Sequence, residues 1–191
     1  MTERVVLIGD SIRMGYQAVV RQALADVATV WAPEENGFDS RNVLAHLDAW
    51  VFAQAPTVVH LNCGLHDVKR DRDTQAIATP LPVYQDTVRQ ILERVLQGTE
   101  ARVIWATITP VDEAQHRRCK DFDRYTADVD AYNQAALEVV TALGVPVDDL
   151  SSVVAGDARC AQKDGVHYTE DGYAVLGAAV ARAIRGGIRQ D

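Results

Sequence analysis

The stretch Val5-Val6-Leu7-Ile8-Gly9-Asp10-Ser11, close to the start of the chain, decides the fold. Its apolar run is short, mostly β-branched and unbroken, which is typical of a strand buried on both faces of a parallel sheet. The glycine ends that run, and residues 12–26 then place apolar side chains at helical spacing. The stretch therefore predicts a buried strand, a tight turn that carries Ser11, and a helix that begins directly afterwards.

The alternation of short apolar runs with longer amphipathic stretches continues to the end of the chain. Strands that alternate with helices pair in parallel through right-handed crossovers. The sequence thus predicts an α/β protein, a three-layer α/β/α sandwich whose site lies at the carboxyl ends of the strands. We expect further strands at residues 29–31, 57–61, 102–108 and 145–147, and further helices at residues 41–54, 82–96, 125–143 and 170–184.

The segments between these elements are polar. Ser40 has a side chain suited to an N-cap, and we expect it to cap the helix at residues 41–54. Residues 66–80 and 111–121 are rich in charged side chains, and we expect loops there. No repeat or linker divides the chain, so residues 1–191 are predicted to form one domain.

The composition is that of an ordinary globular protein with an acidic surface. The net charge of −8 repels phosphate backbones and anionic lipid headgroups, so we expect neither nucleic acid nor a membrane as a partner. The apolar run at residues 5–8 is too short for a signal peptide, and the three cysteines show no paired spacing. These features predict a cytoplasmic protein that acts on a small molecule, and they leave the oligomeric state open.

Ser11 is the first candidate for chemistry, because it lies where a strand ends and a helix begins, and backbone N–H groups there stabilise negative charge. A serine hydroxyl needs a base, and an imidazole such as that of His167 is suited to proton transfer near neutral pH. Asp164 precedes that histidine by three residues across Gly165, so its carboxylate can fix the imidazole tautomer and leave the other nitrogen facing the serine. Taken singly, these residues also fit a capping serine and an exposed loop histidine.

A third polar segment, Asn62-Cys63-Gly64-Leu65-His66-Asp67, follows the strand at residues 57–61. Adjacent parallel strands end at the same edge of the sheet, so we expect this segment beside Ser11. Gly64 allows close backbone approach. The ring of His66 can donate a hydrogen bond to an oxyanion, or it can bind a loop carbonyl as a structural histidine.

Together these segments resemble the SGNH (GDSL-type) hydrolase family over essentially the whole chain. The block that runs from Asp164 through His167 to Tyr173 is typical of it. The resemblance implies a flavodoxin-like five-stranded sheet, no cofactor or metal, and a triad of Ser11, His167 and Asp164 that hydrolyses esters through an acyl-enzyme. It also implies an oxyanion hole built from the N–H of Ser11, the N–H of Gly37 and an Asn side chain.

One position departs from the family pattern. Where the family has Gly-x-Asn-Asp, this chain reads Gly64-Leu65-His66-Asp67, so His66 stands in place of the asparagine. An imidazole also donates one hydrogen bond, so we expect His66 to take over that role. Loss of one such donor costs about 3 kcal/mol, so the departure bears on rate and substrate more than on reaction type.

The polar loops favour a short acyl group on a hydrophilic alcohol, such as an acetylated sugar. We expect Asp10, Asn62, Gly64 and Arg70 to lie close to such a substrate. A lysophospholipase or thioesterase activity is the first alternative, and a weakly active or non-catalytic carbohydrate-binding protein is the second.

Two further classes fit the sequence less well. A metallohydrolase would use His60, His66, Asp67 and His167, although zinc sites usually show a tighter ligand set. A flavodoxin-like cofactor protein would need a glycine-rich phosphate cradle, which the turn at residues 9–11 does not provide.

Overall fold

A five-stranded parallel sheet forms the centre of the computed structural model, which describes residues 2–155, 157–160 and 162–187. The strands lie in the order β2-β1-β3-β5-β7, which is the flavodoxin-like order, so the predicted fold class is confirmed. The register places Val5 beside both Val30 and Val58. The strands are β1 (Glu3–Ile8), β2 (Ala28–Trp31), β3 (Val58–Leu61), β5 (Arg102–Ala106) and β7 (Val147–Asp148).

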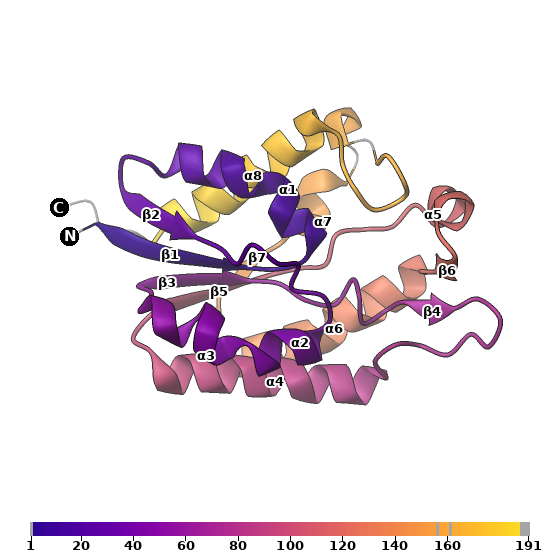
Figure 1. The fold of residues 1–191 in the computed structure, drawn as a ribbon, viewed down its shortest axis with the longest axis horizontal. Coiled ribbons are helices and arrows are strands. Elements are labelled where there is room, and N and C mark those ends of the chain that lie inside the picture. Colours follow the sequence, from indigo (N-terminus) through magenta and orange to yellow (C-terminus); the bar gives the residue numbers. More distant parts are fainter. Residues whose placement is uncertain (1, 156, 161, 188–191) are drawn as a thin grey trace.

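Helices cover both faces of the sheet (Figure 1). One face carries α1 (Ser11–Ala23), α7 (Leu150–Val154) and α8 (Glu170–Arg185), and the other carries α2 (Ser40–Ala45), α3 (Leu47–Trp50), α4 (Leu81–Gly98) and α6 (Thr126–Ala142). Burial on both sides explains why the strands read as unbroken apolar runs: every residue from Val5 to Ile8 and from Val58 to Leu61 is buried. No helix in the described part of the chain is long and apolar enough to cross a lipid bilayer.

The prediction of one helix over residues 41–54 is wrong. The structure has α2, α3 and a 3₁₀ turn at Phe52–Gln54, because His46 leaves helical geometry and its ring Nδ1 bonds the carbonyl of Asn42 at 2.8 Å. The predicted cap is also wrong. Asp39 caps α2 by accepting from the N–H of Asn42 at 3.0 Å, while the Ser40 hydroxyl donates to Asp67 at 2.6 Å.

The two segments expected as loops contain short elements that pair with each other. Arg70–Asp71 forms β4, which pairs antiparallel with β6 (Phe122–Asp123). Helix α5 (Glu113–Cys119) precedes β6, and Asp112 caps it by accepting from the N–H of Gln115 at 2.9 Å. Figure 1 shows these elements beyond the end of the sheet, on the side where the strands end.

Close packing of α1 against α8 sets the distance between the first and the last helix. A Cβ on Gly15 would lie 2.2 Å from the ring of Tyr173, and one on Gly177 would lie 2.6 Å from Cβ of Val19. Both glycines therefore permit a helix–helix distance that a larger residue would prevent. Since Ser11 begins α1 and His167 shortly precedes α8, this distance decides whether the two residues meet.

We predict that Gly177→Ala lowers the free energy of unfolding by about 1–3 kcal/mol, because the added methyl group must displace Val19 or the backbone of Tyr16. Urea denaturation measures this change. Gly186→Ala is the matched control, since the nearest atom to its Cβ is 3.5 Å away, and it should change stability by less than about 0.5 kcal/mol. Equal stabilities of the two variants would contradict this account of the helix contact.

Candidate active site

Ser11 is the first residue of α1, directly after the turn that leaves β1. Asp10 is the N-cap: its Oδ1 accepts from the N–H of Ile12 at 2.9 Å. The first N–H groups of a helix have no acceptor within the helix, so the N–H of Ser11 is available to a ligand. Asp10 is only 2% exposed and burial raises its pKa, so the structure gives it a capping role rather than the expected contact with substrate.

Ser11, His167 and Asp164 form a continuous chain of hydrogen bonds. The Ser11 Oγ lies 2.7 Å from Nε2 of His167, and Nδ1 of His167 lies 2.8 Å from Oδ2 of Asp164. A carboxylate can only accept, so Nδ1 donates to it and Nε2 is left to accept from the serine hydroxyl. The structure thus brings together three residues that the sequence separates by up to 156 positions.

The loop that carries Asp164 and His167 rests on the N-terminus of α5. The N–H of Asp112 donates to the carbonyl of Gly165 at 2.9 Å, and a Cβ on Gly165 would lie 2.4 Å from the backbone nitrogen of His116. Gly165 also has φ of 86°, which favours glycine. The segment expected as an overhanging loop therefore supports the triad residues directly.

Lys120, at the end of α5, also contacts the triad. Its Nζ lies 2.7 Å from Oδ2 of Asp164, the same oxygen that accepts from His167. Burial by itself would raise the pKa of Asp164, but the hydrogen bonds from Lys120 and His167 outweigh that effect and hold the pKa below its usual range. Sequence analysis missed Lys120 because no motif links it to Asp164.

Gly37 lies beside the first turn, but its N–H is already in use. It donates to the carbonyl of Gly9 at 3.0 Å, and a Cβ on Gly37 would lie only 2.6 Å from that oxygen. The expectation that the Gly37 N–H serves an oxyanion is therefore corrected. The next residue, Phe38, has φ of 50° and donates its N–H to Oδ1 of Asn36 at 2.8 Å in an exposed position.

Arg13 holds the loop that contains Gly37 against α1. Its side chain is 1% exposed, and it donates to the carbonyls of Pro33 at 2.9 Å and Glu35 at 2.7 Å and to the side chain of Gln17 at 2.7 Å. The sequence analysis did not predict Arg13 as a residue of the site. An arginine one turn into the first helix carries no pattern that reveals such a role.

The ring of His66 packs edge-on against Phe38, with ring centroids 5.5 Å apart. Burial lowers the pKa of His66 to about 3, and the positive charges of Lys69 and Arg124 act in the same direction. His66 is therefore a neutral imidazole at physiological pH, with one N–H to donate. Arg124 supports this segment from the other side by donating to the carbonyl of Leu65 at 2.6 Å.

Asn62 and Gly64 belong to the same segment and pack it against β5 and the residues that follow β5. The side-chain amide of Asn62 donates to the carbonyl of Ala106 at 2.7 Å. Gly64 has φ of 136°, and a Cβ there would lie 2.3 Å from Ile108. Asn62 thus links the end of β3 to β5, and Gly64 leaves room for Ile108, so the structure gives both residues a role other than the substrate contact that was expected.

Other predicted residues also have different partners. Arg70 forms two hydrogen bonds with the carboxylate of Asp128, at 2.6 and 2.7 Å, so its guanidinium is not the free substrate-binding group that was expected. His60 is fully buried and bonds Asp148 at 3.0 Å. Within residues 2–155, 157–160 and 162–187, no group of His, Cys, Asp or Glu side chains is placed to hold a metal ion.

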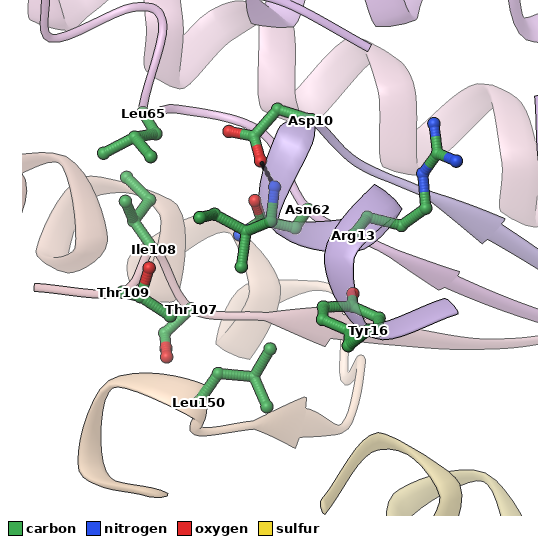
Figure 2. Close-up of a pocket in the computed structure, with 10 residues that line it drawn as sticks. Asp10, Arg13, Tyr16, Asn62, Leu65, Thr107, Ile108, Thr109 and Leu150 are labelled. Atoms are coloured by element: carbon green, nitrogen blue, oxygen red, sulfur yellow. Dashed lines mark hydrogen bonds between the residues drawn. The ribbon is translucent and has the colours of Figure 1, made fainter. Parts of the chain in front are cut away.

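A cavity of about 10 Å³ lies beneath the start of α1, and its volume suits about one water molecule. Figure 2 shows Asp10 bonded to a backbone nitrogen at this cavity, with Leu65 and Ile108 close together beside it. Asp10 and Ile12, which flank Ser11 in the sequence, line the cavity, but Ser11 does not. The cavity therefore lies inside the protein rather than on the substrate side of the serine.

The sheet order and the covering helices define a flavodoxin-like α/β protein with a polar site at the carboxyl edge of its strands. Residues 7–175 match the model of the GDSL-like Lipase/Acylhydrolase family, and the chain belongs to this family. The family acts on small-molecule esters, which confirms the predicted class of hydrolase.

Solved structures share the fold across the whole chain. A lipase/acylhydrolase from Enterococcus faecalis has a TM-score of 0.83 at 24% identity and covers 100% of this chain and 99% of its own. An acetylxylan esterase from Geobacillus stearothermophilus has a TM-score of 0.76 at 21% identity, covering 98% and 95%. A GDSL-like lipase from Bacteroides thetaiotaomicron has a TM-score of 0.76 at 21% identity, covering 97% and 89%. A comparison with curated proteins found no match.

We predict that Arg13→Met lowers the free energy of unfolding by about 2–4 kcal/mol, because it leaves the carbonyls of Pro33 and Glu35 without a donor. Guanidinium denaturation measures the loss. Arg21→Met, on the exposed face of the same helix, serves as the control and should change stability by less than about 0.5 kcal/mol. An Arg13 variant as stable as this control would show that the loop does not depend on the guanidinium.

Proposed function

We propose that this protein is a serine-dependent hydrolase of carboxylic esters in which Ser11 is the nucleophile, His167 the general base and Asp164 the residue that orients the base. The observation that carries the proposal is the unbroken hydrogen-bond chain from the Ser11 Oγ through the His167 ring to Oδ2 of Asp164. Each group in that chain has the partner that its role requires.

In the proposed reaction, the Ser11 Oγ attacks the ester carbonyl carbon while its proton passes to Nε2 of His167. The protonated ring then gives this proton to the departing alkoxide, and the alcohol leaves an acyl group on Ser11. Water attacks the acyl-enzyme by the same route, with its proton going to His167, and the carboxylic acid is released with the serine restored. Asp164 stabilises the imidazolium that forms in each half of the reaction.

The oxyanion of each tetrahedral intermediate needs donors that are already in place. We propose the N–H of Ser11, the neutral ring of His66, and the N–H of Phe38 in place of that of Gly37. Phe38 supports this revision because its ring contacts His66 and its exposed N–H is bonded only to the side chain of Asn36, which an oxyanion can replace. The N–H of Gly37 instead fixes the loop to the end of β1.

We propose a short acyl group, such as acetyl, on a small hydrophilic or carbohydrate alcohol as the substrate. The segments around the triad, β4, β6 and α5, are polar and interlinked by Arg72, which donates to the carbonyl of Lys120 at 2.6 Å. The acetylxylan esterase with the same fold agrees with this substrate class.

We predict that Ser11→Ala reduces kcat for p-nitrophenyl acetate by at least ~10⁴-fold, because no other group replaces the nucleophile. A stopped or continuous assay of p-nitrophenol release measures the loss, and circular dichroism checks that the fold is intact. The wild type should also react quickly with a serine-directed fluorophosphonate, and the Ser11 variant should not.

Ser152→Ala, which removes an exposed hydroxyl from α7, is the matched control and should keep full turnover and labelling. Undiminished hydrolysis by the Ser11 variant would refute the proposed nucleophile. A wild type that neither hydrolyses acetyl esters nor takes up the fluorophosphonate would favour a non-catalytic binding protein.

We predict that His66→Leu lowers kcat/KM by about 10²–10³-fold, since it removes one oxyanion donor. His66→Asn restores a donor of similar reach and should stay within about tenfold of the wild type. Because burial keeps the pKa of His66 near 3, its titration should leave no limb in the pH–rate profile above about pH 5. Equal rates for the Leu and Asn variants would remove His66 from the oxyanion hole.

A further inference from the structure

We propose that Lys120 is a positioning residue of this site: by binding the carboxylate oxygen of Asp164 that also accepts from His167, it sets the pH range in which His167 acts as a base. This inference rests on the triad proposed above. It adds a fourth residue that touches neither substrate nor reacting atoms and acts only through Asp164.

The contact is direct and shared. The Nζ of Lys120 lies 2.7 Å from Oδ2 of Asp164, and Nδ1 of His167 lies 2.8 Å from the same atom. The other oxygen, Oδ1, accepts from the backbone N–H of His167 at 2.9 Å. Lys120 and the imidazole therefore donate to the same acceptor oxygen. The charge of Lys120 lies close to the ring on which the imidazolium forms.

Both backbone polar groups of Lys120 are hydrogen-bonded, which holds the residue in place beside Asp164. Its N–H donates to the carbonyl of His116 at 3.0 Å, which ends α5, and its carbonyl accepts from Arg72 at 2.6 Å. The same helix supports the triad loop through Asp112 and Gly165. Helix α5 thus fixes the position of Lys120 and supports the loop that carries Asp164.

The electrostatic consequence has a definite sign. A positive charge beside Asp164 stabilises its carboxylate and opposes a second positive charge on the His167 ring. The side chain of Asp164 is 19% exposed and that of Lys120 is 30% exposed. Solvent therefore screens the interaction between these charges only in part. Loss of the Lys120 charge should therefore stabilise the imidazolium that His167 forms when it takes a proton.

Other charged or titratable groups face this pair, and none replaces Lys120. In the part of the chain that the structure describes, Lys120 and His167 are the residues that form ion pairs with Asp164. The remaining neighbours act from further away: they are Asp10 at the start of α1, His66 after β3, His116 on α5, Arg124 after β6 and Tyr173 on α8.

The test compares the pH dependence of kcat/KM for p-nitrophenyl acetate in the wild type, K120M and K120R. Removal of the charge in K120M should move the acid limb to higher pH by roughly 0.5–1 unit, with rates on the alkaline plateau within about threefold of the wild type. K120R keeps a cation at this place and should keep the wild-type acid limb.

The matched control is K163M. Lys163 lies next to Asp164 in the sequence and is exposed, and in the described residues its side chain forms no ion pair with that carboxylate. K163M removes the same charge from the same loop and should shift the limb by less than about 0.2 unit. A purely structural role for Lys120 would lower the rate at every pH and leave the limb in place, which would overturn the proposal.

A second measurement does not depend on activity. An NMR titration of the His167 ring in the Ser11→Ala background, with and without K120M, should show the midpoint rise by the same amount. K120Q replaces K120M if the latter does not fold. An unshifted midpoint overturns the role of Lys120 even if the ester hydrolase proposal holds, and a shifted midpoint in a protein without esterase activity supports Lys120 while the proposed function fails.

Discussion

The hydrogen bond between the Ser11 Oγ and Nε2 of His167 depends on how closely α1 can approach α8. Neither residue belongs to the sheet: Ser11 is the first residue of α1, and His167 lies just before α8. The parallel sheet brings both helix starts to one edge, and the contact through Gly15 and Gly177 limits their separation. The bond from Asp112 to Gly165 supports the loop that carries His167. The geometry of the candidate site therefore depends on helix packing, and it tolerates little change in side-chain volume where α1 meets α8.

The loops at the same edge need hydrogen-bond partners from outside the sheet. Their backbone carbonyls lie outside the sheet, so no ladder satisfies them, and buried guanidinium groups do so instead. Arg13 serves the loop before Gly37, and Arg124 serves the segment before His66. Buried Asp67 provides acceptors in the same way: its carboxylate accepts from the N–H and the hydroxyl of Ser40. Burial raises the pKa of Asp67 to about 6. Charged groups in the interior thus hold the loops that carry the proposed oxyanion donors.

The sequence predicted the parts of the molecule that repeat a simple pattern. Unbroken apolar runs identified the strands, and helical spacing identified the long helices. The turn after β1 and the block before α8 predicted that Ser11, Asp164 and His167 meet, and their hydrogen bonds show that they do. Prediction failed where a residue's role depends on what packs against it. Nothing in the stretch around Gly37 indicates that its N–H reaches back to Gly9, and the two-residue strands β4 and β6 are too short to show any period. Lys120 was missed for the same reason, since only the fold places it beside Asp164.

Two histidines belong to the proposed site, and their surroundings give them different chemistry. His167 has the carboxylate of Asp164 on one ring nitrogen and the serine hydroxyl on the other, so a proton taken from the serine is stabilised where it arrives. His66 lies against Phe38 with the cations Lys69 and Arg124 nearby, and burial lowers its pKa to about 3. A ring that cannot gain a proton in this range cannot compete as a base, and it keeps its single N–H for donation. A neutral His66 ring is therefore compatible with the oxyanion role proposed for it, which needs one N–H donor.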